Sequence, residues 1–452
     1  KRSIVSVSWS LTRSHHGEQP FWMAITLAAM LGQIGLEGGG VAFGFSAENS
    51  IGSDAHLTPI EELPKGKNGV GDYIPVARVA ELLENPGGKH QYDGETLQYP
   101  DIKVVWWSGG NPYHHHQDLN RLARAWEKPD TIIVNDWCWT ATAKRADIVL
   151  PVTTHVERED LQLAQRDPYI VAMKKVVEPP KDVRNDHQIF KGIAAELGAE
   201  EDFTQGRSEE EWLRWMWDKT RQNPEAEGLG LPDWDELQKM GWYKTPKQEK
   251  PTVMLRAFRE DPLANPLGTP SGKIEIYSDV VAGFGYDDCP GHAAWRVPYE
   301  WLGDVGDHPL HMISNQPRNK LHSQLDQGNV SAAGKIKDRE PVVLHPKDAQ
   351  SRGISDGDAV KVFNARGAAL GVAVVSDEVR NGVIVMSTGA WWDPDENGMC
   401  RHGNPNALTR DVGTSQLGQG PTAHSCLVDV EKFNAELPRV QAFDPPEIIW
   451  RE

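Results

Sequence analysis

Val104–Trp126 reads VVWWSGGNPYHHHQDLNRLARAW and carries the clearest indication of fold class in this chain. A short, continuously apolar run stops at Gly109-Gly110-Asn111-Pro112, and a helical pattern follows over Leu119–Trp126. Two further apolar runs come next, at Thr131–Asn135 and at Ala146–Leu150. Short apolar strands that alternate with helices are typical of a parallel sheet buried on both faces. The pattern predicts a doubly wound α/β region, in which ligands bind beyond the carboxyl ends of the strands.

From residue 309 onward the chain changes to short β runs separated by turn residues. Two clear turn signals are Asp356-Gly357-Asp358 and Asn364-Ala365-Arg366-Gly367. Short strands at regular spacing predict a closed β-barrel. The expected strands are His311–Ser314, Val342–His345, Ala359–Asn364, Ala368–Val375, Gly382–Ser387 and Cys426–Glu431.

Outside these two regions the patterns are weaker. Ser3–Trp9 looks like a strand, and Pro20 opens an apolar helix that ends near Gly35. An alternating pattern predicts a strand at Ser271–Tyr277, and residues 278–308 form a plausible linker. Further helices are predicted at residues 75–84, 187–198 and 209–221.

Composition excludes several classes of protein. The net charge of −18 disfavours nucleic acid or an anionic membrane as the main partner, because both reward a basic face. No run of 18 apolar residues occurs, so no membrane span is predicted. The four cysteines form no C-x-x-C pair, which argues against a zinc ribbon or an iron–sulfur cradle within this chain. The 17 tryptophans suit either flat ligands or core filling, and both remain open.

The turn at Gly109-Gly110-Asn111-Pro112 follows a strand and precedes a helix. Glycines at such a position let a phosphate or pyrophosphate approach backbone N–H groups, although an ordinary strand-to-helix turn would look the same. His114-His115-His116 follows directly. Adjacent side chains cannot all face one ion, so we expect one histidine to lie against a nucleotide rather than three to bind a metal.

Two polar segments follow the next strands. Asn135-Asp136 ends one strand, where an Asp commonly accepts from a ribose hydroxyl or a purine N–H, or else caps a helix. The charge run Glu157–Asp160 lies just past the carboxyl end of another strand. Such a run is either a solvated face or part of the ligand site.

Amide-rich segments gather in the barrel region. Gln316 lies close in sequence to Leu321-His322-Ser323-Gln324, and Asn404–Asn406 precedes a second polar cluster that ends at Gln419-Gly420. Amide side chains supply both donors and acceptors, which suits a heterocycle that bears several of each. Turn chemistry explains each segment taken singly. Together they favour a protein that holds a large polar cofactor.

These segments resemble the molybdopterin oxidoreductases of the dimethyl sulfoxide reductase family, most of all the trimethylamine N-oxide, dimethyl sulfoxide and biotin sulfoxide reductases. The stretches that carry the resemblance are WSLTRSHHGEQPFWMAITLAAMLGQIGLEGGG, WSGGNPYHHHQDLNRL, WTATAKRADIVLPVTTHVERED, SNQPRNKLHSQL and GNPNALTRDVGTSQLGQG.

The resemblance implies a fold, a cofactor and three domains. The α/β region would be Rossmann-like, the barrel would be of double-psi type, and two molybdopterin guanine dinucleotides would surround one molybdenum. Residues 1–60 would end an α/β cofactor domain, 61–300 would bind dinucleotide and include an irregular insert, and 309–452 would cap the cofactor.

The resemblance also implies site residues, carried over motif by motif. Those expected at a cofactor arm are Trp9, Ser10 and Arg13. Those expected along the phosphate, ribose and guanine path are Asn111, His115, Asn135, Asp136 and Arg158, with Asp186 as a weaker candidate. Those expected to face the pterins are Gln316, His322, Gln324, Asn406, Gln419 and Gly420.

Two departures and one gap accompany the resemblance. The family usually has Gln where Thr12 stands and Pro where Glu37 stands, and neither change removes a charged cofactor contact. The chain begins at Lys1 without Met or a signal peptide, so we expect it to be the rear piece of a longer protein. In the family the serine that ligates the metal lies upstream of this piece. No catalytic residue and no metal ligand is therefore assigned here.

The main hypothesis is a reductase that takes an oxygen atom from an S-oxide or N-oxide. A biotin or methionine sulfoxide reductase is the alternative within that class. A nucleotide-binding module without redox activity, or more remotely a metal-dependent hydrolase, is the alternative outside it. The family further implies the front half of the same enzyme and a cytochrome c-type electron donor as partners. The expected location is the periplasm, with the cytoplasm as the alternative.

Overall fold

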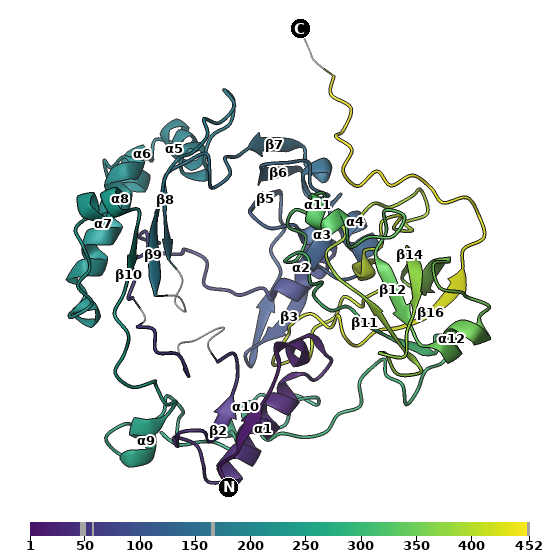
Figure 1. The fold of residues 1–452 in the computed structure, drawn as a ribbon, viewed down its shortest axis with the longest axis horizontal. Helices are drawn as coiled ribbons and strands as arrows, with labels where there is room; N and C mark the ends of the chain where they lie inside the picture. Colours follow the sequence, from purple (N-terminus) through teal and green to yellow (C-terminus); the bar gives the residue numbers. More distant parts are fainter. Residues whose placement is uncertain (46–50, 57, 164–167, 450–452) are drawn as a thin grey trace. The chain divides into compact units, whose positions relative to one another are not determined.

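The chain folds as two units in the computed structural model, which describes residues 1–45, 51–56, 58–163 and 168–449 (Figure 1). The first unit comprises Lys1–Trp9, Ala24–Gly71 and Leu150–Glu275. The second unit comprises Ser10–Met23, Asp72–Val149 and Ile276–Glu452. The architecture is mixed α/β with parallel strand pairs and a closed six-stranded barrel. The domain boundaries expected near residues 60 and 309 stay predictions.

The predicted parallel strands lie mainly in the second unit. Strand β5 (Val104–Ser108) pairs in parallel with β6 (Thr131–Asp136), and β7 (Ile148–Pro151) completes the order β5-β6-β7. Between β5 and β6 the chain forms α3 (Pro112–His115) and α4 (Leu119–Ala125). Because Ser108 pairs with Asn135, the turn after β5 and the end of β6 lie at the same edge of the sheet.

Short elements precede and follow this sheet in the second unit. The 3-10 helix η1 (Trp9–Arg13) starts at the boundary between the units, and η2 (Val76–Arg78) leads into α2 (Val79–Glu84). Strands β3 (Lys89–Tyr92) and β4 (Glu95–Gln98) form a hairpin. Further short helices are η3 (Ala143–Arg145), α10 (Asp279–Gly283), α11 (Asn329–Ala332), α12 (Pro346–Ser351) and η5 (Pro405–Ala407).

The barrel is built from all six β runs that the sequence predicts. Its order is β11-β15-β12-β14-β13-β16, closed by the pairing of β16 with β11. Along β12 the side chains alternate, so Val342 and Leu344 are fully buried while their neighbours are not. The strands are β11 (Leu310–Ile313), β12 (Pro341–Leu344), β13 (Ala359–Asn364), β14 (Gly367–Val375), β15 (Val383–Met386) and β16 (Leu427–Lys432).

One hydrophobic core joins the barrel to the α/β part of the second unit. Leu122 of α4 and Ile132 of β6 belong to the same buried cluster as Leu344 and Met386 of the barrel. Full burial of one such side chain contributes about 1.5–3 kcal/mol. In Figure 1, α2, α3 and α4 accordingly lie beside the green barrel strands. This shared core fixes the barrel loops relative to the turn after β5.

The first unit has a parallel strand pair and a small antiparallel sheet. Strand β1 (Ile4–Ser6) pairs with β2 (Gly40–Ala42), and α1 (Glu18–Met30) enters this unit from the second one. The sheet has the order β10-β9-β8, which the sequence did not predict. Its strands are β8 (Asp160–Leu163), β9 (Tyr169–Met173) and β10 (Trp242–Lys244).

Two helices of this unit, α7 (Glu209–Gln222) and α8 (Trp234–Met240), pack against this sheet around a core rich in tryptophan. Trp217 and Trp234 pack with Ile170 and Leu237, so the core-filling interpretation holds for these two tryptophans. The predicted helices at 187–198 and 209–221 are confirmed, and each begins with a capping box. The helices are α5 (Asp186–Glu196), α6 (Glu200–Thr204), α7 (Glu209–Gln222), η4 (Pro224–Ala226), α8 (Trp234–Met240) and α9 (Arg256–Glu260).

The predicted strand at Ser271–Tyr277 is wrong. Its side chains satisfy the local backbone instead, because the Ser271 N–H donates to Glu275 Oε1 at 2.9 Å and the Lys273 N–H donates to Ser271 Oγ at 3.3 Å. Only Tyr277 makes a bridge, to His292. The expected linker at 278–308 also contains a helix, α10. Among the described residues, no helix has the length and apolar character needed to span a bilayer.

Candidate functional site

Of the three consecutive histidines, the two that belong to α3 face a loop of the barrel region. The His115 ring lies 5.1 Å from the His322 ring, and the His114 ring lies 6.1 Å from it. Nitrogens of all three rings come within 4.8 Å of one another. His116 turns away and meets the edge of Trp107 at 6.1 Å. As expected for adjacent residues, the three side chains of the run do not share one point.

These imidazoles are held neutral. Burial lowers the pKa of His115 to about 4 and that of His114 well below its ordinary value. Burial also lowers the pKa of His322, and the nearby Arg13 guanidinium lowers it further. A neutral imidazole offers one N–H donor and one acceptor nitrogen. The positive charge of Arg13 beside them favours an anionic or electron-rich ligand over a metal cation.

Two buried polar atoms at this cluster lack a partner within the part of the chain that the structure describes. They are His114 Nδ1 and Asn111 Nδ2. Asn111 is only 5% exposed, and its other side-chain atom, Oδ1, accepts from Thr142 Oγ1 at 2.6 Å. Buried polar groups are nearly always hydrogen-bonded, so an unpaired donor beside a glycine turn indicates room for a ligand acceptor.

The glycine turn itself is open. Gly109 and Gly110 have φ values of +74° and +79°, which favour glycine. A Cβ built on Gly109 would meet no atom of the described residues within 4 Å. A Cβ on Gly110 would lie 3.6 Å from Trp107 Nε1, which is an ordinary contact. Two successive left-handed residues, with open space beside Gly109, leave backbone N–H groups accessible to a phosphate.

The amide-rich loops converge on the same cluster. Asn406 Nδ2 donates to the His114 carbonyl oxygen at 2.5 Å. Gln316 contacts His322 through its side chain, with Nε2 lying 2.9 Å from Nδ1 of the ring. The His424 N–H donates to the Arg13 carbonyl oxygen at 2.9 Å, which ties η1 to the segment that follows Gln419 and Gly420.

Gln419 is nearly fully buried and has a positive φ of +49°. Its Oε1 accepts from Arg78 Nε at 2.8 Å, and its Nε2 donates to the Gln91 carbonyl oxygen at 2.8 Å. A Cβ on the adjacent Gly420 would lie 3.3 Å from the Thr12 carbonyl oxygen. The segment Gln419–Gly420 is therefore held against both η1 and η2.

Asn135 and Asp136 lie at the carboxyl end of β6, as predicted. Trp106 Nε1 donates to Asn135 Oδ1 at 3.0 Å. Asp136 accepts from the Trp137 N–H at 2.9 Å and from Thr140 Oγ1 at 2.6 Å, and burial raises its pKa. The next helix, η3, has its N-cap at Thr142, so Asp136 shapes the turn rather than capping that helix.

The remaining predicted residues either belong to the first unit or are exposed in the second unit. Trp9 belongs to the first unit, where its ring meets Phe43 edge-on at 5.3 Å. Arg158 pairs with Asp160 at 2.8 Å, and Asp186 is the exposed first residue of α5, both in the first unit. In the second unit, Ser10 and Gln324 are exposed.

Three further residues at the cluster were not predicted from the sequence. His114 has a ring nitrogen without a partner in the described part of the chain, Thr142 donates to Asn111, and Arg78 donates to Gln419. His114 and Thr142 belong to the motifs that carry the family resemblance, and their place in those motifs could have identified them. Arg78 stands outside every motif, and nothing in the sequence pointed to it.

Two family models match the chain. One, described as "Molybdopterin oxidoreductase", matches residues 1–196. The other, described as "Molydopterin dinucleotide binding domain", matches residues 310–427. The chain belongs to the molybdopterin oxidoreductase family. The resemblance drawn from the sequence motifs is thereby confirmed.

Similar proteins within this family cover nearly the whole chain. A biotin sulfoxide reductase of Cereibacter sphaeroides is 48% identical over 95% of this chain and 58% of its own length. A trimethylamine-N-oxide reductase of Haemophilus influenzae is 43% identical over 99% of the chain and 57% of its own length. A dimethyl sulfoxide/trimethylamine N-oxide reductase of Cereibacter sphaeroides is 43% identical over 99% of the chain and 56% of its own length. The chain thus spans a little over half the length of these curated relatives.

A solved structure supports the fold. Acetylene hydratase from Pelobacter acetylenicus superposes with a TM-score of 0.58 over 74% of this chain and 45% of its own, at 20% sequence identity. At that identity the likeness speaks for the fold alone.

The residues of the cluster fit the dinucleotide that the family binds. Gly109 leaves space for a phosphate, and Asn111 Nδ2 and His114 Nδ1 have no hydrogen-bond partner among the residues that the structure describes. Neutral His115 and His322 can hydrogen-bond a heterocycle, while Arg13 supplies positive charge. This donor set suits a polar, anionic cofactor that carries a nitrogen-rich ring.

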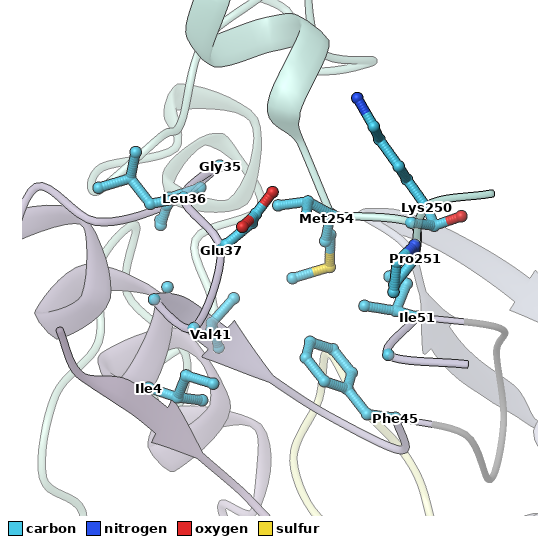
Figure 2. Close-up of a pocket in the computed structure, with 17 residues that line it drawn as sticks. Ile4, Gly35, Leu36, Glu37, Val41, Phe45, Ile51, Lys250, Pro251 and Met254 are labelled. Atoms are coloured by element: carbon cyan, nitrogen blue, oxygen red, sulfur yellow. The ribbon is translucent and has the colours of Figure 1, made fainter. Parts of the chain in front are cut away.

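A separate cavity of about 560 Å³ lies within the first unit (Figure 2). Its walls are largely apolar, and Phe45, Ile51 and Met254 converge there. Glu37, which replaces the usual family proline, is also at its edge. The residues that line it among those described include no predicted cofactor residue, so the cavity is distinct from the histidine cluster.

Proposed function

We propose that the protein containing this chain is a molybdenum-dependent reductase that removes an oxygen atom from S-oxides or N-oxides, of the trimethylamine N-oxide or dimethyl sulfoxide type. The observation that carries the proposal is the convergence of the glycine turn, the neutral histidines and the amide loops around Arg13. The bound cofactor would be bis(molybdopterin guanine dinucleotide) molybdenum. Relatives named for these substrates support the choice.

The residues of this chain bind and orient the cofactor in this proposal. Backbone N–H groups at Gly109 and Gly110 hold phosphate oxygens, and Asn111 Nδ2 donates to the same path. His115 and His322 remain neutral at pH 7 and so act as hydrogen-bond partners of the pterins. When bound, the cofactor supplies the molybdenum redox chemistry that accepts the oxygen atom.

Further site residues contribute to the two ends of the cofactor. Asn135 and Asp136 bind ribose or guanine at the carboxyl end of β6. Gln316, Asn406 and Gln419 face the pterins from the barrel loops, where their amide groups can both donate and accept.

The finer fold assignment belongs to the same proposal. The α/β region is doubly wound and Rossmann-like, which the parallel β5–β6 pair with α4 in its crossover supports. The barrel is of double-psi type, and its mixture of parallel and antiparallel strand pairs is in keeping with that topology.

Biotin sulfoxide or methionine sulfoxide is the alternative substrate. The relative with 48% identity that is named a biotin sulfoxide reductase favours the first of these. The remaining partners are the front portion of the same enzyme and a cytochrome c-type electron donor. The proposed location is the periplasm, with the cytoplasm as the alternative, and the family resemblance is the support for both partners and location.

The test begins with the composition of the purified holoenzyme that contains this chain. Molybdenum together with acid-released guanine nucleotide is expected, and nucleotide without molybdenum would favour the non-redox binding module. Turnover is then compared for trimethylamine N-oxide, dimethyl sulfoxide and biotin sulfoxide with a reduced viologen dye. Arg13→Met should lower nucleotide content, whereas Arg214→Met, a change on an exposed face of α7, should not.

A further inference from the structure

Four charged side chains lie buried together beneath the loop that carries Gln316 and His322. Lys320 and Asp326 are 1% and 0% exposed, and Lys335 and Glu340 are 5% exposed each. Both ammonium groups contact the same two oxygens, Asp326 Oδ1 and Glu340 Oε1. The distances for Lys320 are 2.8 and 2.6 Å, and those for Lys335 are 2.9 and 2.6 Å. We call these four residues the charge quartet.

Two positive and two negative charges balance within the quartet. Burial alone would lower the pKa of Lys320, but the charges of Glu340 and Asp326 outweigh burial and raise it. Lys320 therefore stays charged. Removing one partner would leave an uncompensated buried charge, which is far more costly than losing a surface pair.

The quartet ties the 315–324 loop to the barrel, because Glu340 directly precedes β12 and its carbonyl oxygen accepts from the Val372 N–H of β14 at 3.2 Å. Asp326 Oδ2 accepts from His402 Nε2 at 2.9 Å and from the Trp391 N–H at 3.1 Å. The Trp391 indole in turn donates to the Ser323 carbonyl oxygen at 2.8 Å. The loop is thus held at Lys320, at Ser323 and at Asp326, which bracket His322.

The backbone between these anchors is strained. His322 and Leu325 have φ values of +50° and +52°, although neither is glycine. Such conformations persist only where the surroundings over-determine them. Packing adds to the constraint, because a Cβ on Gly389 would lie 2.3 Å from the His322 carbonyl oxygen and 2.4 Å from Lys320 Cε.

The quartet also lies within electrostatic reach of the histidine cluster. Burial dominates the low pKa of His114, but the charge of Asp326 raises that pKa and the charge of Lys320 lowers it. The same side chains that hold the loop therefore influence the ring opposite His322.

We propose that Lys320 is a positioning residue that, through Asp326 and Glu340, holds His322 and Gln316 in the geometry that binds the cofactor. The proposal rests on the proposed function, because it assumes that the loop faces the pterins. Lys335 neutralises the same two oxygens from a segment outside the loop, so its role is to balance charge. Comparing the two lysines therefore distinguishes an effect on the position of the loop from an effect on the stability of the protein.

The test compares Lys320→Met with Lys335→Met in the holoenzyme. Each change removes one ammonium group from the same two carboxylate oxygens, so similar losses of melting temperature are expected. Acid-released guanine nucleotide per chain should fall about tenfold in K320M and stay within about twofold of wild type in K335M. Amide hydrogen exchange at residues 315–324 should be faster in K320M than in K335M, with and without cofactor. Equal nucleotide content and equal exchange in the two variants would overturn the proposal.

Charge-balanced versions guard against a simple failure to fold. K320M/E340Q and K335M/E340Q each retain one lysine and Asp326, and the same difference in nucleotide content and exchange is expected between them. A wild-type holoenzyme without guanine nucleotide would refute the proposed function instead. The exchange comparison would then decide the positioning role alone, with equal rates counting against it.

Discussion

The side-chain amide of Gln316 contacts His322 twice. Its Oε1 accepts from the His322 backbone N–H at 3.2 Å, and its Nε2 lies 2.9 Å from Nδ1 of the ring. The backbone contact requires the oxygen at that position, which fixes the orientation of the amide. Nε2 must therefore donate to Nδ1, and the ring proton of a neutral His322 stands on its Nε2. One glutamine thus sets both the position and the tautomer of a candidate cofactor-binding histidine.

Gln316→Glu should raise the pKa of His322. The carboxylate replaces a donor by an acceptor and adds a negative charge beside the ring, so the protonated imidazole gains a partner. The expected rise is about one pH unit or more, which opposes the lowering by burial and by Arg13. An NMR titration of the His322 Cε1 proton measures it. Gln324→Glu adds the same charge at an exposed position of the same loop, and an equal rise there would contradict the contact-specific explanation.

Gly389→Ala should destabilise the protein and displace the His322 backbone. Gly389 has a φ of +114°, and the added Cβ would clash with the His322 carbonyl oxygen. The expected loss is ~2–4 kcal/mol in the free energy of unfolding measured in urea. Gly353→Ala is the matched control, because Gly353 also has a positive φ of +64° but no described atom lies within 4 Å of a built Cβ. The control should lose only ~1 kcal/mol, and similar losses in both would rule out the clash.

Local sequence patterns predicted the positions of strands and helices better than they predicted which strands pair. The barrel strands were found because alternation and turn residues are local signals, and β11 to β16 each carry both. The sheet β8-β9-β10 was missed because β10 joins β9 only after the helices α5 to α8 intervene. The wrongly predicted strand at 271–277 shows that alternation alone does not make a strand. Without a partner strand, the backbone of this segment is hydrogen-bonded by its own side chains.

The candidate site was also predicted only in part. The motif residues around Gly109 and Asp136 were placed correctly at one sheet edge, because strand ends are readable from the sequence. The meeting of His115 with His322 depends on the shared core of sheet and barrel, which no local pattern encodes. The charge quartet was missed for a third reason. Lysines and carboxylates in a polar loop are expected in solvent, and only tertiary structure shows Lys320 to be buried.

Asp136→Ala should weaken nucleotide retention more than folding. Loss of a charged acceptor for ribose or guanine costs about 1.5–3 kcal/mol of binding, and loss of the turn contacts to Trp137 and Thr140 costs about 1 kcal/mol of stability. Asp147→Ala is the control, because Asp147 Oδ2 accepts from the Ile132 N–H at 2.7 Å near the opposite end of β6. Nucleotide content and melting temperature are measured together. Equal nucleotide content in the two variants would leave Asp136 with a turn-forming role only.

Asp411 provides a prediction for pH dependence, and it lies in the loop that leads to Gln419. Its side chain is 6% exposed and pairs with Arg121 at 3.1 Å. Burial raises its pKa to about 7; Arg121 opposes that rise, and the nearby Asp118 and Glu84 add to it. Arg121 also pairs with Glu84, at 2.8 Å between Nη2 and Oε2, so one guanidinium pairs with two carboxylates.

The sign of the effect follows from the raised pKa. An unfolded aspartate titrates near pH 3.9, so between about pH 4 and 7 the folded state holds a proton at Asp411 that the unfolded state has lost. The free energy of unfolding should therefore fall as pH rises through this window and level off above pH 7. Asp411→Asn removes the titration, so the variant should match wild type near pH 4 and exceed it by ~2–4 kcal/mol at pH 8. Urea unfolding at pH 4.5, 6 and 8 measures the slope. A variant that is less stable than wild type at pH 8 would mean that the Arg121 ion pair outweighs burial, and Asp411 would then be ionised in the folded protein.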